Sequence, residues 1–103
     1  MKPLILAVAL VMLASTARAD TTFFGNELGN LLASETVCGL KYRPEAIEAL
    51  VRKRVGGDLV EFASRLSLLT SNAAFDLKSM SADARAAHCM EVKKTAKSYG
   101  FID

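Results

Sequence analysis

The sequence predicts an all-α protein, a compact bundle of four short helices with one disulfide. Apolar residues recur at steps of three and four along most of the chain, as on one face of a helix, and strand-like alternation is scarcely visible. The chain also holds two cysteines in all, which can form one intramolecular bond. A fifth helix results if the third helical segment breaks in two.

Residues 1–19 have the three parts of a secretory signal peptide. A positively charged start precedes the apolar run 4–14, and an Ala-x-Ala motif closes the segment at Ala17 and Ala19. As a helix the run covers roughly 16 Å, about half the hydrocarbon core of a bilayer. We therefore expect cleavage before Asp20, with a site after Ala17 as the nearest competitor and a retained membrane anchor as the alternative.

The remaining domain, residues 20–103, is expected to carry no net charge. Cleavage would remove Lys2 and Arg18, which leaves eleven basic and eleven acidic side chains. Such a balance gives little long-range attraction to nucleic acid or to an anionic membrane. We therefore expect neither a nucleic-acid partner nor a stable membrane insertion. The signal peptide predicts a periplasmic or secreted protein, and the oligomeric state stays open between a monomer and a small homo-oligomer.

Cys38 and Cys89 are the two cysteines, and in an exported chain an even pair predicts a disulfide. The chain-entropy model assigns a loop of this length at most about 4 kcal/mol of stabilisation. Two free buried thiols are the alternative. The pair lacks the C-x-x-C spacing of redox enzymes, which argues against a catalytic role.

The first expected helix ends near Cys38 and carries Phe24 and Leu28 on its apolar face. Gly25 and Gly29 interrupt it, and each costs roughly 1 kcal/mol relative to alanine in a helix interior. We therefore expect this helix to depend on tertiary contacts.

The second expected helix covers residues 44–55. Pro44 suits the first helical turn, where its missing N–H is no loss, and Gly56 and Gly57 end the segment. Gly39 suits a left-handed stop after the first helix.

The third segment, residues 58–79, has the clearest pattern. Asp58 followed by Glu61 resembles a capping box. The segment forms one long helix or breaks near 70–72, where three weak helix formers adjoin. An apolar stripe along it is expected to face the core or a partner helix, and it consists of Leu59, Phe62, Leu66, Leu69, Ala73 and Leu77.

The fourth expected helix begins after Ser81 as its N-cap and contains Cys89. Gly100 suits its C-terminal stop, with Phe101 folding back over the last turn. The disulfide would then pin the N-terminal helix against the C-terminal helix and enclose the two middle helices.

No group of residues in the sequence indicates catalysis or metal binding. His88 is the single histidine, which excludes a multi-histidine metal site, and on a helix it points about 100° away from Cys89. We interpret His88 as a helix-surface residue, and Met80 and Met90 as core filler rather than soft-metal ligands. We therefore expect a non-enzymatic protein with no catalytic residues, no cofactor and no metal.

Five basic residues form a candidate interaction surface around the second helix. Lys41 and Arg43 precede this helix, and Arg52, Lys53 and Arg54 lie in its last turn. Together they could bind an anion. The alternative is a solvated helix terminus, where cations complement the negative end of the helix dipole.

Several short motifs resemble a group of short secreted proteins from alphaproteobacteria. The motifs are Cys-Gly-Leu at 38–40, Gly-Asp-Leu-Val-Glu-Phe-Ala-Ser at 57–64, Ala-Arg-Ala-Ala-His-Cys at 84–89 and Lys-Ser-Tyr-Gly-Phe at 97–101. The resemblance implies a small exported protein and assigns no activity. Some members carry the label signal recognition particle, but a neutral, exported chain contradicts that cytosolic, RNA-bound role.

The layout also resembles the periplasmic acid-stress chaperones of the HdeA type, which are small, exported and helical. Their two cysteines stand about fifty residues apart, as Cys38 and Cys89 do, whereas residues 37–40 depart from their first cysteine motif. Two hypotheses follow. The leading one is a non-enzymatic binding protein of the cell envelope that engages a protein partner through helical surface. The alternative is a chaperone that is activated when acid protonates its carboxylates.

Overall fold

The computed structural model describes residues 21–103, and these form four helices and no strand. The predicted all-α class and single disulfide are confirmed. The expected signal peptide 1–19 and its cleavage site at Ala17, Ala19 and Asp20 lie outside the described residues. In the part of the chain that the structure describes, no helix combines the length and apolar character that crossing a bilayer requires.

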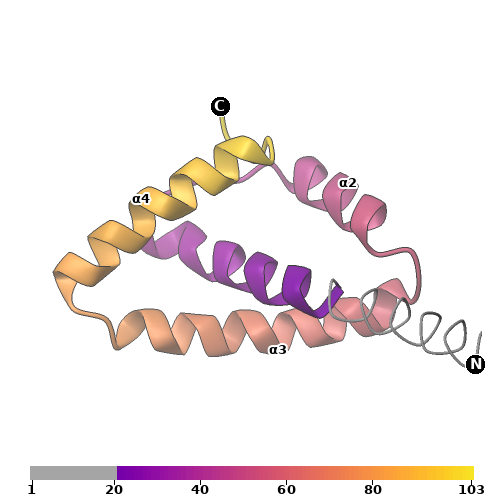
Figure 1. Cartoon of the computed structure of the whole chain (residues 1–103), viewed down its shortest axis with the longest axis horizontal. Helices are drawn as coiled ribbons and strands as arrows, with labels where there is room; N and C mark the ends of the chain where they lie inside the picture. Colours follow the sequence, from indigo (N-terminus) through magenta and orange to yellow (C-terminus); the bar gives the residue numbers. More distant parts are fainter. Residues whose placement is uncertain (1–20) are drawn as a thin grey trace, which may run out of the picture.

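The four helices follow one another through short connections (Figure 1). After helix 21–37 come α2 (Pro44–Arg54), α3 (Leu59–Lys78) and α4 (Ala82–Ser98). The third predicted segment is one unbroken helix, so the optional fifth helix does not form within the described chain.

Helix 21–37 is the central element, because it contacts each of the other three helices. The Phe24 ring stacks on the Phe62 ring of α3, with the ring centroids 5.8 Å apart. The guanidinium of Arg54, at the end of α2, lies 5.3 Å from the centroid of the same Phe24 ring. The N-terminal helix, rather than the two middle helices, therefore takes the central place in the bundle.

The predicted disulfide joins Cys38 to Cys89, with their Cα atoms 5.4 Å apart. Cys38 directly follows helix 21–37, and Cys89 lies in the middle of α4. The bond therefore holds the C-terminal end of the central helix against the last helix, as the sequence predicts.

The core is small and draws unequally on the helices. α2 contributes no buried residue and packs through half-buried side chains such as Ile47 and Val51. α3 and α4 contribute three and two buried residues respectively. The main buried cluster consists of Phe24, Leu28, Leu31, Tyr42, Val55, Phe62, Val92, Ala96 and Phe101.

The predicted helix caps form. The carboxylate of Asp58 accepts a hydrogen bond from the Glu61 N–H at 3.0 Å, and the Ser81 hydroxyl oxygen accepts one from the Ala84 N–H at 3.1 Å. Each bond satisfies one of the amide donors that the first turn of a helix leaves unpaired.

The C-terminal stop also forms as predicted. Gly100 has φ +78°, in the left-handed region, and the N–H of Phe101 donates to the Ala96 carbonyl at 2.9 Å. The Phe101 side chain folds back and is fully buried, with its ring 5.5 Å from that of Tyr42.

The predicted stripe on α3 faces the interior except at its first residue. Phe62, Ala73 and Leu77 are buried, and Leu66 is half-buried. Leu59 lies outside the core, because its side chain is 40% exposed, and of the two predicted environments only a partner helix stays open for it. Leu59 is the first residue of α3, before the helix packs against its neighbours.

Gly25 and Gly29 are buried where helix 21–37 crosses α3. A Cβ atom on Gly29 would lie 3.1 Å from the Leu69 Cβ and 3.2–3.3 Å from backbone atoms of Leu69 and Thr70. A Cβ on Gly25 would meet only side-chain atoms, at 3.4 Å or more. Gly29, which weakens the helix locally, therefore allows the two backbones to approach closely.

Gly25→Ala and Gly29→Ala should change stability in opposite directions. Alanine at position 25 gains helix propensity of up to about 1 kcal/mol without a clash. Alanine at position 29 gains the same propensity but pushes on the α3 backbone, and overpacking costs about 1–3 kcal/mol. Thermal unfolding followed by circular dichroism measures both variants. Equal stabilisation of the two would contradict the close crossing at Gly29.

Candidate functional site

A hollow of about 410 Å³ opens along the seam between helix 21–37 and α4. Its walls combine apolar side chains with two carboxylates, an amide, a hydroxyl and an imidazole. The lining residues are Glu27, Asn30, Leu31, Met80, His88, Glu91, Val92 and Thr95. This variety of polar groups makes the hollow a candidate site for ligand binding or catalysis.

His88, which lines this hollow, contacts the buried Ser34. The Ser34 hydroxyl donates to the Asn30 carbonyl at 2.6 Å, and the same oxygen lies 2.8 Å from the His88 Nε2. A hydroxyl carries one hydrogen. Because the Asn30 carbonyl takes that hydrogen, Nε2 of His88 must be the donor in the second bond.

This geometry corrects the interpretation of His88 as a plain surface residue. Its ring is half-buried and bridges α4 to helix 21–37, close to the disulfide. Ser34 precedes Cys38 by one helical turn, and His88 directly precedes Cys89. The disulfide therefore brings Ser34 and His88 together. The predicted pairing of the cysteines was the signal in the sequence that could have revealed this hydrogen bond.

The Ser34–His88 pair does not have the geometry of a nucleophile and its base. In such a pair the serine donates its proton to the imidazole, whereas here the imidazole donates to the serine. Ser34 also has no exposed surface, so a substrate cannot reach its oxygen. The pair can therefore hold two helices together but cannot support covalent catalysis as arranged.

A second polar contact lies at the far end of the hollow. The Tyr99 hydroxyl donates to the carboxylate of Glu27, which joins the end of α4 to helix 21–37. Burial raises the pKa of Tyr99, and the hydrogen bond to Glu27 and its negative charge raise it further, while Arg54 acts in the opposite direction. Glu27 is thus occupied by a structural contact.

Among residues 21–103, no three side chains of the metal-binding types gather closely enough to hold an ion. The two methionines predicted to fill the core differ in their surroundings. Met80 is half-buried beside the hollow, whereas Met90 is 66% exposed on α4, so its interpretation as core filler is wrong. Met90 instead lies among Lys93, Lys94 and Lys97 on the outside of α4.

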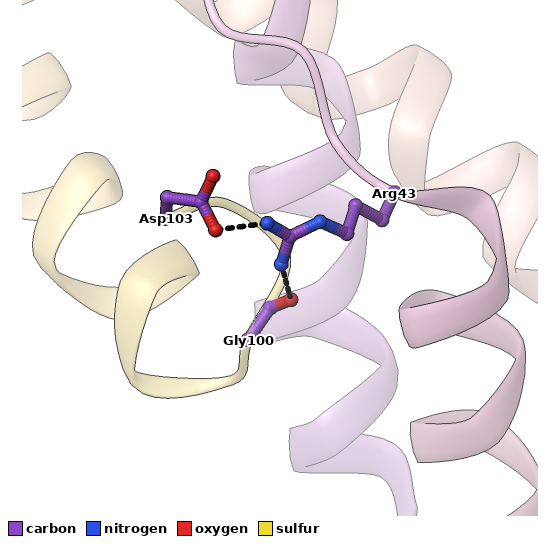
Figure 2. A network of polar contacts seen from close by, with 3 residues as sticks. All are labelled: Arg43, Gly100 and Asp103. Carbon is purple, nitrogen blue, oxygen red and sulfur yellow. Dashed lines mark hydrogen bonds and ion pairs between the residues drawn. The ribbon is translucent and has the colours of Figure 1, made fainter.

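The five basic residues of the candidate interaction surface divide between the two ends of α2. Arg43, just before the helix, donates to the Gly100 carbonyl at 3.2 Å and forms an ion pair with Asp103 (Figure 2). Its backbone N–H also donates to the Phe101 carbonyl, at 3.0 Å. Arg43 therefore fastens the connection before α2 to the C-terminus, and exposed Lys41 stands near it in the chain.

The other three cations lie about 16 Å away along the helix, given its eleven residues. Arg52 pairs with Glu48 one turn earlier, at 2.8 Å, and Arg54 lies over the Phe24 ring. Lys53 is exposed. The structure thus separates the predicted cations and gives three of them internal partners.

The outward side of α3 carries a third feature, which we call the outer strip. Its members are Val60, Ser64, Ser67, Leu68, Ser71 and Phe75, all of them exposed. At about 100° per residue they fall within roughly 100° of one another around the helix. In Figure 1, α3 forms one edge of the arrangement with helix 21–37 on its inner side.

The large apolar side chains of the outer strip are strongly exposed, at 79% for Val60, 63% for Leu68 and 72% for Phe75. Between Glu61 and Asp76 the helix has one charged residue, Arg65, whose guanidinium lies over the Phe62 ring. The strip is therefore an uncharged row of three large apolar side chains and three serines. Periodicity predicted the inward stripe of the same helix but did not reveal this second row.

Comparison of the chain with protein-family models, with curated proteins and with solved structures returned no significant match.

Tyr42 connects the end of helix 21–37 to the core, and the pKa of its phenol is raised. Its hydroxyl donates to the Leu31 carbonyl at 2.8 Å, and its N–H donates to the Glu35 carboxylate at 2.6 Å. Burial, and then the negative charge of Glu35, raises the pKa of Tyr42 to about 12. The neutral phenol is therefore favoured in the folded state.

Stability should fall as pH rises from about 10 to about 12. The pKa of Tyr42 in the folded state lies above the unfolded value of 10. The stabilisation that its neutral phenol contributes is therefore complete below pH 10 and is lost as pH rises from about 10 to about 12. Tyr42→Phe should lower stability at pH 7 by about 1 kcal/mol and flatten the alkaline decline. Urea unfolding at several pH values measures both effects. An equally steep decline in the variant would assign it to other groups.

Proposed function

We propose that this chain is an exported, non-enzymatic binding protein of the cell envelope that docks a protein partner on the outer strip of α3. The observation that carries the proposal is the exposure of Val60, Leu68 and Phe75 in one uncharged row. Scattered apolar residues are ordinary on protein surfaces, but a contiguous row on one helix face is typical of an interaction site.

The other surfaces support binding less well. Glu27, Ser34 and His88 at the seam hollow are engaged in contacts between helices. Three of the five cations around α2 have partners within the chain. The outer strip has no such engagement in the described residues, and its serines leave room for another helix to approach.

Export is supported by the disulfide and by the composition of the first nineteen residues. Disulfides persist in oxidising compartments and are rare in the cytosol. The Cys38–Cys89 bond spans 51 residues and therefore restricts a large part of the unfolded chain. We therefore infer a periplasmic or secreted location, where such a disulfide persists and can stabilise a protein with a small core.

Site-specific photo-cross-linking in an exporting bacterium tests the docking surface. A photoreactive amino acid at position 68 should give adducts in the periplasmic fraction. The same amino acid at position 90 is the matched control, because Leu68 and Met90 are exposed at 63% and 66% on different helices. Adducts at position 90 but not at 68, or protein recovered only from the cytosol, would overturn the proposal.

An acid-activated chaperone is the second candidate, supported by carboxylates that hold separate segments together. Glu27 accepts from Tyr99, Glu35 accepts from the backbone beyond helix 21–37, and Asp103 pairs with Arg43. Below about pH 3 carboxylates are protonated, which weakens charge-assisted contacts and leaves the chain strongly positive. Such a molecule would loosen and expose its apolar side chains.

Protection of a client protein from aggregation at about pH 2–3 tests this candidate. The chaperone hypothesis expects protection with the disulfide intact and binding of a hydrophobic dye over the same pH range. The same assay on the reduced protein shows whether protection requires a chain that acid has loosened while the disulfide still restrains it, or arises equally from a completely unfolded chain. A chain that neither protects a client nor binds dye in acid is not a chaperone of this type.

A further inference from the structure

We propose that the partner on the outer strip is a second copy of this chain, paired antiparallel along α3. The inference rests on the proposed function, because it names the partner of the same surface. The observation that carries it is a symmetry in the strip itself: its six members are arranged evenly about one point, between Ser67 and Leu68.

In an antiparallel pair with two-fold symmetry, residues that face each other have numbers with a constant sum. A two-fold axis between positions 67 and 68 gives the sum 135. Val60 then faces Phe75 of the other copy, and Ser64 faces Ser71. Ser67 and Leu68 lie beside the axis on opposite flanks of the strip, so each is nearest its own counterpart in the other copy. Every strip residue therefore meets another strip residue. The strip is thus complementary to itself in one register, with Phe75 opposite the smaller Val60.

The charges at the two ends of α3 favour the same arrangement. In the antiparallel pair the C-terminal end of each α3, with Lys78 in its last turn, lies beside the N-terminal end of the other, with Glu61 in its first turn. Asp76 follows Phe75 by one residue and therefore stands about 100° round the helix from it, on the flank of the pair. A parallel pair would instead bring Lys78 against Lys78 and align the two helix dipoles unfavourably.

The size of the contact sets the expected affinity. α3 has 20 residues and is therefore about 30 Å long. A contact along one face of such a helix buries on the order of 1,000 Å² in total, close to the lower limit of about 1,200 Å² for a standard interface. We therefore expect a reversible dimer with a dissociation constant in the micromolar range.

Sedimentation equilibrium of protein purified from the periplasm, across micromolar concentrations, tests the dimer. The wild-type chain should pass from monomer to dimer. Leu68→Lys would place two ammonium groups beside the two-fold axis and should weaken association at least tenfold. Met90→Lys adds the same charge at an equally exposed site on α4 and should leave association unchanged. Circular dichroism checks that both variants fold.

Cysteine cross-linking tests the register without relying on a loss of binding. Ser64→Cys and Ser71→Cys, each alone, should give little intermolecular disulfide, because positions 64 and 71 do not face themselves. A mixture of the two single variants should give a cross-linked pair on a non-reducing gel. Efficient cross-linking of each variant with itself would overturn the antiparallel register.

The outcomes separate this inference from the proposed function. A wild-type chain that sediments as a monomer at all concentrations overturns the second copy as partner. If photo-cross-linking at position 68 still captures a different envelope protein, the docking surface itself stands. A dimer that persists in the Leu68→Lys variant places self-association on another surface and overturns the inference.

Discussion

The Cys38–Cys89 bond holds the end of the central helix against α4, and the rest of the bundle is arranged around that junction. The Ser34–His88 hydrogen bond lies one turn away and depends on the same alignment of the two helices. α2 buries none of its residues, so the core has little apolar area with which to hold four helices. The disulfide therefore stabilises an arrangement of helices that core packing alone would stabilise in a larger domain.

The second constraint is the close approach of helix 21–37 to α3. Gly29 lets the α3 backbone come within contact distance, which places Phe24 on Phe62 and turns the stripe of Phe62, Ala73 and Leu77 inward. A helix that presents one face to its neighbour presents the opposite face to solvent. The exposure of the outer strip is thus a direct consequence of how the interior is packed.

The chemistry of the molecule is consistent with a structural use of its polar groups. Tyr99 and Glu27, Ser34 and His88, and Arg43 and Asp103 each join segments that are distant in the sequence. Groups committed in this way are poor candidates for catalysis, because a reacting group must be free to contact its substrate. Among residues 21–103, the outer strip is a surface without such commitments and with three large exposed apolar side chains, and for this reason both proposals rest on it.

The sequence by itself determined the local features, because these depend on residues a few positions apart: the helix bounds, the caps at Asp58 and Ser81, and the Gly100 stop. It also determined the disulfide, since two cysteines allow one pairing. Tertiary structure alone decided which helix is central and which face of α3 is exposed. Periodicity predicted the apolar row that meets the core, but it did not reveal the second row on the same helix. The crossing at Gly29 holds the first row against helix 21–37 and leaves the second row exposed.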